Sequence, residues 1–178
     1  MKRRLVLWVP LIVFLVIGAV AAWNLYRPSD RLIHSRLVGE PLPAFVLPPA
    51  LPGRATVSRA DYAGEPRILN IFASWCVPCI AEAPQLMAMS RRGVPIDAIA
   101  IRDRPQDIQM FLSRWGDPYR NVALDADSSL QLAIGSSGVP ETFVIDGRGT
   151  IRFQHIGPIT DADMARLIQE YEAARVPS

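Results

Sequence analysis

The amino-acid sequence predicts an α/β domain in which helices flank a mixed sheet, preceded by one separate apolar helix. Buried-strand patterns alternate with amphipathic helix patterns between residues 67 and 134. A hairpin pattern and a closing amphipathic helix follow them. A long apolar run occupies the first 25 residues. Since domains typically contain ~100 to 200 residues, a chain of 178 residues allows one such domain and a short extra segment.

The N-terminal run has the composition of a membrane segment. Three basic residues within positions 1–4 precede eighteen uncharged residues, 5–22, and the apolar character extends to Leu25. About 20 such residues span a bilayer as a helix, so we expect residues 5–25 to form a transmembrane anchor and residues 1–4 to be cytoplasmic. A cleaved signal peptide is the alternative, because Ala19-Val20-Ala21 fits a small-x-small cleavage pattern. Both interpretations place the remaining domain outside the cytoplasm.

The charge is divided unevenly along the chain. The net charge is +2, but residues 1–36 carry six cations and a single acid, while residues 37–178 carry 13 cations and 16 acids. A slightly acidic domain argues against nucleic-acid binding. The chain has two cysteines, in one CxxC, which excludes a scaffold of several disulfides and leaves a zinc site short of sulfur ligands.

The first predicted elements follow a linker. We expect residues 26–40 to form this linker and the domain to occupy residues 41–178. Frequent proline and glycine allow at most short strands before about residue 67. Continuous apolar runs at 67–72 and 96–101 predict strands buried on both faces. Apolar stripes at helical spacing predict helices at 79–92 and 105–115.

The second half completes the pattern. After Gly116-Asp117-Pro118-Tyr119 we expect a strand near 122–124 and a brief helix over 128–134. Strands at 143–145 and 151–155 flank the turn Asp146-Gly147-Arg148-Gly149. Thr160 or Asp161 is expected to cap a closing helix that runs to about residue 174. The order βαβαβ, then a hairpin and a helix, is that of the thioredoxin-like fold.

The CxxC motif lies where redox chemistry requires it. Cys76-Val77-Pro78-Cys79 follows a predicted strand and opens a predicted helix, whose free N–H groups and positive dipole end lower the pKa of Cys76. Cys76 is therefore the expected nucleophile, and Cys79, one turn further in, is expected to resolve the mixed disulfide. A structural disulfide is one alternative. Another is half of a zinc site, which could recruit only His34, His155 or carboxylates.

Three segments resemble one protein family. The run Asn70-Ile71-Phe72-Ala73-Ser74-Trp75-Cys76-Val77-Pro78-Cys79, with Glu82 and Pro84, resembles the active-site segment of the DsbE/CcmG family. These are membrane-anchored, thioredoxin-like thiol:disulfide oxidoreductases of cytochrome c maturation. Residues 116–119 and the run Gly138-Val139-Pro140-Glu141-Thr142-Phe143-Val144-Ile145-Asp146 resemble two further signatures of that family. With the N-terminal segment, the resemblance covers nearly the whole chain.

The resemblance assigns expected roles to individual residues. General thioredoxins usually carry a buried acid where this chain has Asn70, so Glu82 is the candidate general base for Cys79; the alternative is an ordinary solvated carboxylate. Pro140 matches the cis-proline that faces the two cysteines and leaves the adjacent backbone free to pair with substrate; the alternative is a turn proline. Glu141 is expected to line an acidic groove. Trp75 is expected to cover the thiols and contact substrate.

The resemblance also implies partners and a location. It implies reduction of the CxxCH disulfide of apocytochrome c at the inner membrane, with the domain facing the periplasm and electrons supplied by a transmembrane thiol donor. We expect a monomer without cofactor or metal. A general periplasmic disulfide reductase or oxidase is one alternative, and a non-enzymatic apocytochrome-binding module is another. The pairs Ser136-Ser137 and Arg102-Asp103 depart from the family pattern on surfaces that could touch a partner.

Overall fold

The computed structural model describes residues 2–26 and 35–175 and divides into an N-terminal helical unit and a folded domain. Helix α1 (Lys2–Tyr26) forms where the sequence predicts a helix. Its described side chains, at 8–23, are exposed. In the part of the chain that the structure describes, no helix combines the length and the apolar character needed to cross a membrane. Most of the predicted linker, at 27–34, lies outside the described residues.

The domain has the predicted order of elements. Before the main sheet lie two short strands and a 3-10 helix: β1 (Val46–Leu47), β2 (Val57–Ser58) and η1 (Arg59–Tyr62). The βαβαβ part consists of β3 (Arg67–Phe72), α2 (Val77–Arg91), β4 (Ile96–Ile101), α3 (Pro105–Trp115) and β5 (Asn121–Asp125). It continues with α4 (Ser129–Ala133), the hairpin β6 (Glu141–Ile145) and β7 (Ile151–Ile156), and α5 (Asp161–Ala174). The thioredoxin-like prediction is confirmed.

The main sheet is mixed and places β3 at its centre. Its strand order is β5-β4-β3-β6-β7, with β3, β4 and β5 parallel to one another and β6 antiparallel to both of its neighbours. The register pairs Asn70 with Thr142 and Ile71 with Glu141. The segment after Pro140 therefore lies beside the end of β3, where the CxxC turn begins.

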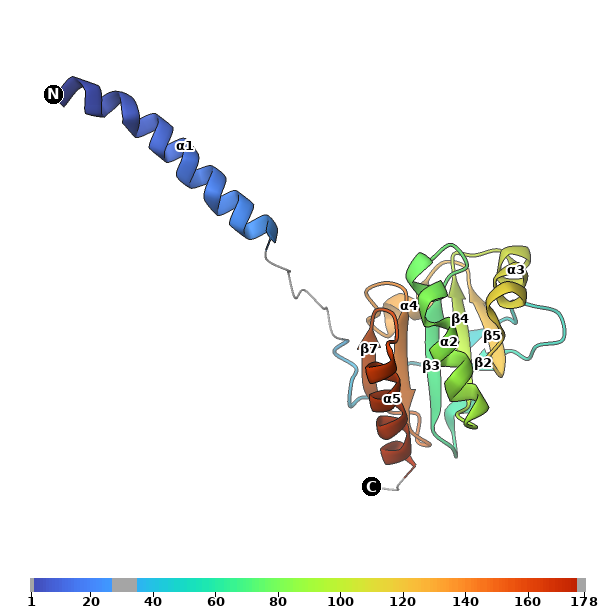
Figure 1. Cartoon of the computed structure of the whole chain (residues 1–178). Helices are drawn as coiled ribbons and strands as arrows, with labels where there is room; N and C mark the ends of the chain where they lie inside the picture. Colours follow the sequence, from blue (N-terminus) through green and yellow to red (C-terminus); the bar gives the residue numbers. More distant parts are fainter. Residues whose placement is uncertain (1, 27–34, 176–178) are drawn as a thin grey trace. The chain divides into compact units, whose positions relative to one another are not determined.

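The helices bury the sheet and position the CxxC turn. Figure 1 shows α2 and α5 crossing the same face of the sheet, and α2 contacts both α3 and α5. Nearly every residue of β3 and every residue of β4 is buried, as their continuous apolar runs predict. Because β3 is fixed on both sides by neighbouring strands, the chain leaves its carboxyl end in a defined direction and enters α2 there.

Helix α2 begins earlier than the sequence predicts, and one glycine of the hairpin turn is required by a close contact between two backbones. Helix α2 begins at Val77 rather than at Cys79, because Cys76 is the N-cap residue and Pro78 suits the first turn, where no backbone N–H is required. In the hairpin turn, a Cβ atom added at Gly147 would lie 2.6 Å from the carbonyl oxygen of Gly64. A glycine is therefore needed for the close approach of these two backbones.

Candidate active site

The two cysteines are joined by a disulfide at the N-terminus of α2. Cys79 N–H donates to the Sγ atom of Cys76 at 3.2 Å, which is the N-cap contact of the helix. Both residues are almost completely buried, Cys76 at 4% and Cys79 at 2% relative exposure. The difference in exposure has the expected direction but is small. What distinguishes the two sulfurs is position: Cys76 precedes the helix, and Cys79 lies inside its first turn.

Asp103 fixes the turn that leads to the disulfide. Its carboxylate accepts hydrogen bonds from the backbone N–H of Ser74 at 2.6 Å and from the Ser74 hydroxyl at 2.7 Å. The preceding residue, Arg102, has a φ of +46° and accepts a hydrogen bond on its carbonyl oxygen from the Trp75 indole at 3.4 Å. The loop after β4 therefore holds the turn after β3. Asp103, which the sequence analysis placed on a surface that could touch a partner, also stabilises this turn.

Glu82 is a fully buried carboxylate one turn beyond Cys79 on α2. Its Oε1 accepts a hydrogen bond from Asn70 Nδ2 at 3.0 Å, and its Oε2 accepts one from the backbone N–H of Ile159 at 3.2 Å. Burial raises the pKa of Glu82 to about 7, although both hydrogen bonds favour the charged form and act against that rise. Its burial argues against the alternative of a solvated helix-start charge. A group that titrates near neutral pH can gain and lose a proton in the working range.

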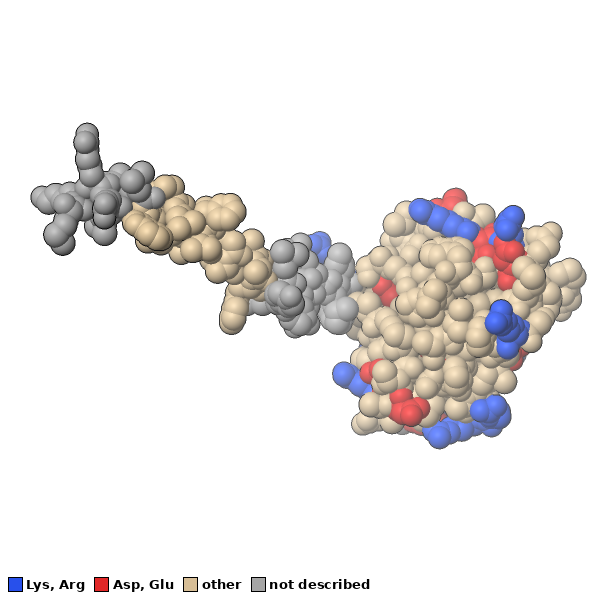
Figure 2. Space-filling view, turned by 45° about the horizontal axis from the view of Figure 1, so that its top comes forward, with Lys and Arg blue, Asp and Glu red and all other residues tan. Residues whose placement is uncertain are grey.

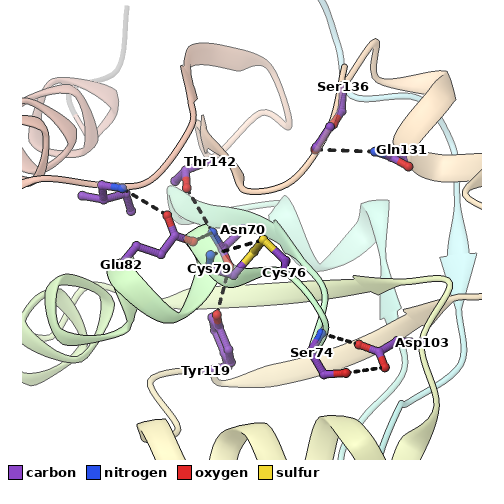
Figure 3. Close-up of a disulfide and its surroundings, with 12 residues drawn as sticks. Asn70, Ser74, Cys76, Cys79, Glu82, Asp103, Tyr119, Gln131, Ser136 and Thr142 are labelled. Atoms are coloured by element: carbon purple, nitrogen blue, oxygen red, sulfur yellow. Dashed lines mark hydrogen bonds between the residues drawn. A yellow bond between two sulfur atoms is a disulfide. The ribbon is translucent and has the colours of Figure 1, made fainter.

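Asn70 joins Glu82 to two further buried side chains, as Figure 3 shows. Its Nδ2 also donates to Thr142 Oγ1 at 3.1 Å, and its Oδ1 accepts from the Tyr119 hydroxyl at 2.9 Å. Tyr119 belongs to the segment Gly116-Asp117-Pro118-Tyr119. The sequence singled out that segment and the position of Asn70 without indicating that they meet beside Glu82.

The Val139–Pro140 peptide bond is cis, and Glu141 follows it as the first residue of β6. The structure differs from the expectation of a groove-lining charge, because the Glu141 side chain is fully buried. Its Oε1 accepts from the backbone N–H and hydroxyl of Ser137 at 2.8 and 2.6 Å, and its Oε2 accepts from Gln154 Nε2 at 3.0 Å. Glu141 thus holds the loop that carries Pro140. Direct contact with substrate stays a prediction.

An open groove lies beside the disulfide, between the CxxC turn and α3. Trp75 is 58% exposed at its edge, and Met110 of α3 is also exposed. The groove is lined by the following residues: Ser74, Trp75, Ile80, Arg102, Asp103, Arg104, Asp107, Met110, Phe111, Arg114 and Trp115. On the face seen in Figure 2, charged side chains form small groups of mixed sign separated by uncharged surface. The exposed apolar groups beside Cys76 offer a surface for a polypeptide partner.

The described residues contain no set of side chains that could form the zinc site considered above. Within 2–26 and 35–175, no three His, Cys, Asp or Glu side chains lie close enough together to hold a metal ion. His155 lies on β7, with Nε2 3.3 Å from the carbonyl oxygen of Pro158. His34 lies outside the described residues.

Comparisons with known proteins agree with the geometry. The family model described as Redoxin matches residues 37–168. The chain is 38% identical over 165 residues to the thiol:disulfide interchange protein DsbE of Escherichia coli (strain K12), covering 89% of this chain and 88% of that protein. It is 36% identical over 162 residues to the protein of the same name in Tatumella citrea, covering 88% of each. A crystal structure of a thioredoxin-family thiol:disulfide interchange protein from Chlorobium tepidum TLS superimposes with a TM-score of 0.61 at 27% identity, covering 76% of this chain and 96% of that one.

Proposed function

Because this chain belongs to the DsbE/CcmG family of thiol:disulfide oxidoreductases, we propose that it reduces the CxxCH disulfide of apocytochrome c before haem attachment. The observation that carries this proposal is the pairing of a redox disulfide with a buried carboxylate. Cys76 and Cys79 form the disulfide at the start of α2, and Glu82 lies one turn further along the same helix. Reduction of a partner needs two thiols and one proton acceptor, and these three residues supply them.

The reaction proceeds by two exchanges. In the reduced protein, the Cys76 thiolate attacks one sulfur of the substrate disulfide; that S–S bond breaks, and the other substrate sulfur leaves as a thiolate that takes up a proton. Cys79 then transfers its proton to Glu82 and attacks the Cys76 sulfur. The mixed disulfide breaks, the second substrate sulfur leaves as a thiolate that takes up a proton, and Glu82 gives up the proton that it accepted. The substrate gains two electrons, and the protein loses two as the Cys76–Cys79 bond forms.

The site supports a polypeptide substrate rather than a small thiol alone. Trp75 and the groove beside it provide exposed apolar surface next to the disulfide. On the other side, the loop before β6 carries cis-Pro140 and is held by the buried Glu141. We propose that Trp75 and the backbone at Pro140 contact the substrate chain. Glu141 contributes by fixing that backbone.

We further propose that the domain works in the periplasm, tethered to the inner membrane. The uncharged run 5–25 with basic residues before it supports an anchor, and helix α1 supports its helical form. An oxidising compartment returns thiols to disulfides, so a reductant there needs a continuing supply of electrons. The proposed source is a transmembrane donor with two thiols, which attacks the Cys76–Cys79 disulfide, reduces it to two thiols and is itself oxidised to a disulfide.

A peptide experiment tests this function. The reduced full-length protein in detergent is mixed with an oxidised peptide carrying CxxCH, and the rate of peptide thiol formation is measured. The comparison peptide has the same composition but carries its histidine away from the cysteines. We expect the CxxCH peptide to be reduced about tenfold faster or more, which corresponds to about 1.4 kcal/mol, the scale of one net hydrogen bond. Equal rates would favour a general reductase, and the absence of transfer to either peptide would contradict the reductant role.

A further inference from the structure

The hydroxyl of Tyr119 has no part in the two exchanges above, yet it lies at the end of a buried chain of hydrogen bonds that reaches Glu82. Tyr119 is 6% exposed, and its ring packs 5.4 Å from the ring of Phe72, centroid to centroid. Its hydroxyl donates to Asn70 Oδ1 at 2.9 Å. Packing alone would be satisfied by phenylalanine, so the buried hydroxyl requires a separate explanation.

The orientation of the Asn70 amide gives that explanation. A primary amide accepts hydrogen bonds at its oxygen and donates them at its nitrogen. Because the Tyr119 hydroxyl donates to Oδ1, it stabilises the orientation in which the amide oxygen faces the tyrosine. The two N–H groups then point to Glu82 Oε1 at 3.0 Å and Thr142 Oγ1 at 3.1 Å, as Figure 3 shows. Burial raises the pKa of Tyr119 well above its usual value, so the hydroxyl stays protonated and is able to donate.

We propose that Tyr119 is a positioning residue for Glu82, acting through Asn70. The Tyr119 hydroxyl keeps an N–H group of Asn70 on the Glu82 carboxylate and thereby favours the form of Glu82 that can accept a proton. This inference rests on the proposed role of Glu82 as the proton acceptor for Cys79. It also gives a function to the tyrosine of the Gly116-Asp117-Pro118-Tyr119 segment.

Loss of the Tyr119 hydroxyl is expected to favour the protonated form of Glu82 over the charged form. Without it, Asn70 Oδ1 is a buried acceptor without a donor, which is costly. Rotation of the amide would turn Oδ1 toward Glu82, where a protonated carboxyl group can donate to it. The neutral form of Glu82 is then favoured, and the pKa of Glu82 rises.

Few other groups act on this carboxylate among the described residues. The segment between β7 and α5 contributes the backbone N–H of Ile159, at 3.2 Å. Asn70 of β3 donates its hydrogen bond to the carboxylate, and Tyr119, before β5, is the buried hydroxyl that interacts with it electrostatically. On its own helix, Cys79 is held in the disulfide of the oxidised protein and does not titrate. Burial and the Ile159 N–H also set the pKa of Glu82 in the oxidised protein, so the contribution of the Asn70 hydrogen bond is read from the difference between the unmodified protein and a variant.

The test is an NMR titration of side-chain carboxyl carbons in the oxidised full-length protein, with ¹³C-labelled glutamate. Glu82→Gln assigns the resonance by removing it. We expect Tyr119→Phe to move the Glu82 midpoint upward by roughly half a pH unit or more, the scale of one net hydrogen bond. Tyr62→Phe is the matched control: Tyr62 is also buried, and its hydroxyl lacks a hydrogen-bond partner in the described structure. It should leave the Glu82 midpoint unchanged.

The outcomes separate this inference from the proposed function. An unchanged or lowered midpoint in a folded Tyr119→Phe variant would overturn the positioning role. If that variant does not fold, Asn70→Leu, which removes the N–H donor directly, must raise the midpoint. The kinetic arm measures the pH dependence of mixed-disulfide resolution, where Tyr119→Phe should shift the midpoint in the same direction and have no further effect in a Glu82→Gln background. If Glu82→Gln itself leaves the pH dependence unchanged, the proposed base is wrong, while the NMR midpoint still decides whether Tyr119 acts on Glu82.

Discussion

Replacing Cys79 with serine is expected to leave the protein covalently joined to its substrate through Cys76. Cys76 precedes α2 and makes the first attack, whereas Cys79 lies inside the first turn of the helix and breaks the mixed disulfide. A serine hydroxyl at position 79 cannot replace that thiol. We expect turnover to fall by a factor of about 10³ or more, as when a reacting nucleophile is removed from other enzymes. The mixed disulfide should accumulate instead.

The measurement is mass spectrometry of the trapped species after purification under non-reducing conditions. The linkage should map to Cys76, and the attached peptide should contain CxxCH. Cys76→Ser is the matched control and should trap nothing. Trapping through Cys79 in that control would reverse the assigned order of the two cysteines. If a Cys76→Ala/Cys79→Ala double variant still fully supported assembly of c-type cytochromes, a non-enzymatic binding module would replace the redox mechanism.

Replacing Glu82 with glutamine is expected to slow the second exchange. Glutamine has a similar shape but cannot take the proton of Cys79. General-base catalysis contributes about 10² to 10⁴ in rate, so we expect the mixed disulfide to resolve about a hundredfold more slowly at pH 8. The first attack by Cys76 should be unaffected, because Glu82 lies further along the helix and is buried.

The rate at which the mixed disulfide is resolved should increase with pH, because Glu82 must be deprotonated to accept the proton of Cys79. Burial raises the pKa of Glu82 to about 7, so the proton-accepting carboxylate is scarce below that pH and predominates above it. The resolution rate of the unmodified protein should therefore rise through a midpoint near pH 7, and Glu82→Gln should lose that rise. Rapid quenching with acid, followed by mass analysis, measures the rate. Asp97→Asn removes a different buried carboxylate, one that pairs with Arg67 at the other end of the sheet, and should keep the midpoint. A midpoint retained in Glu82→Gln would exclude Glu82 as the base.

The regular elements could be predicted because their signals are local. The bounds of β3, β4 and α3 agree with the sequence prediction. The apolar runs of both strands begin after a proline, and the amphipathic stripe of α3 ends at Gly116. The position of Cys76 at the start of α2 follows from the same local pattern. Glu82 falls one turn beyond Cys79 by spacing alone.

The contacts around Glu82 could not be predicted, because they join distant parts of the chain. Asn70 and Thr142 meet because β3 and β6 pair in one register, and Tyr119 reaches Asn70 from the segment before β5. No periodicity in the sequence encodes that register. The buried contacts of Glu141 depend in the same way on Gln154, which lies on the neighbouring strand β7. An isolated glutamate after a proline is more often exposed than buried, so its surroundings decide its role.

The reduction potential of the Cys76–Cys79 pair decides whether this protein donates electrons to its partner or accepts them. A CxxC pair is a strong oxidant when its reduced, dithiol form is stabilised. A carboxylate near the thiols disfavours the thiolate, because two negative charges then lie close together, and so makes the pair more reducing. Glu82 occupies that position on α2. Equilibration of the full-length protein with thiol buffers of known potential, followed by alkylation of free thiols, gives the value. We predict a reduction potential close to that of thioredoxin, about −270 mV. A potential close to that of DsbA, about −120 mV, would show that the protein accepts electrons from its partners and would contradict the proposed reductant role.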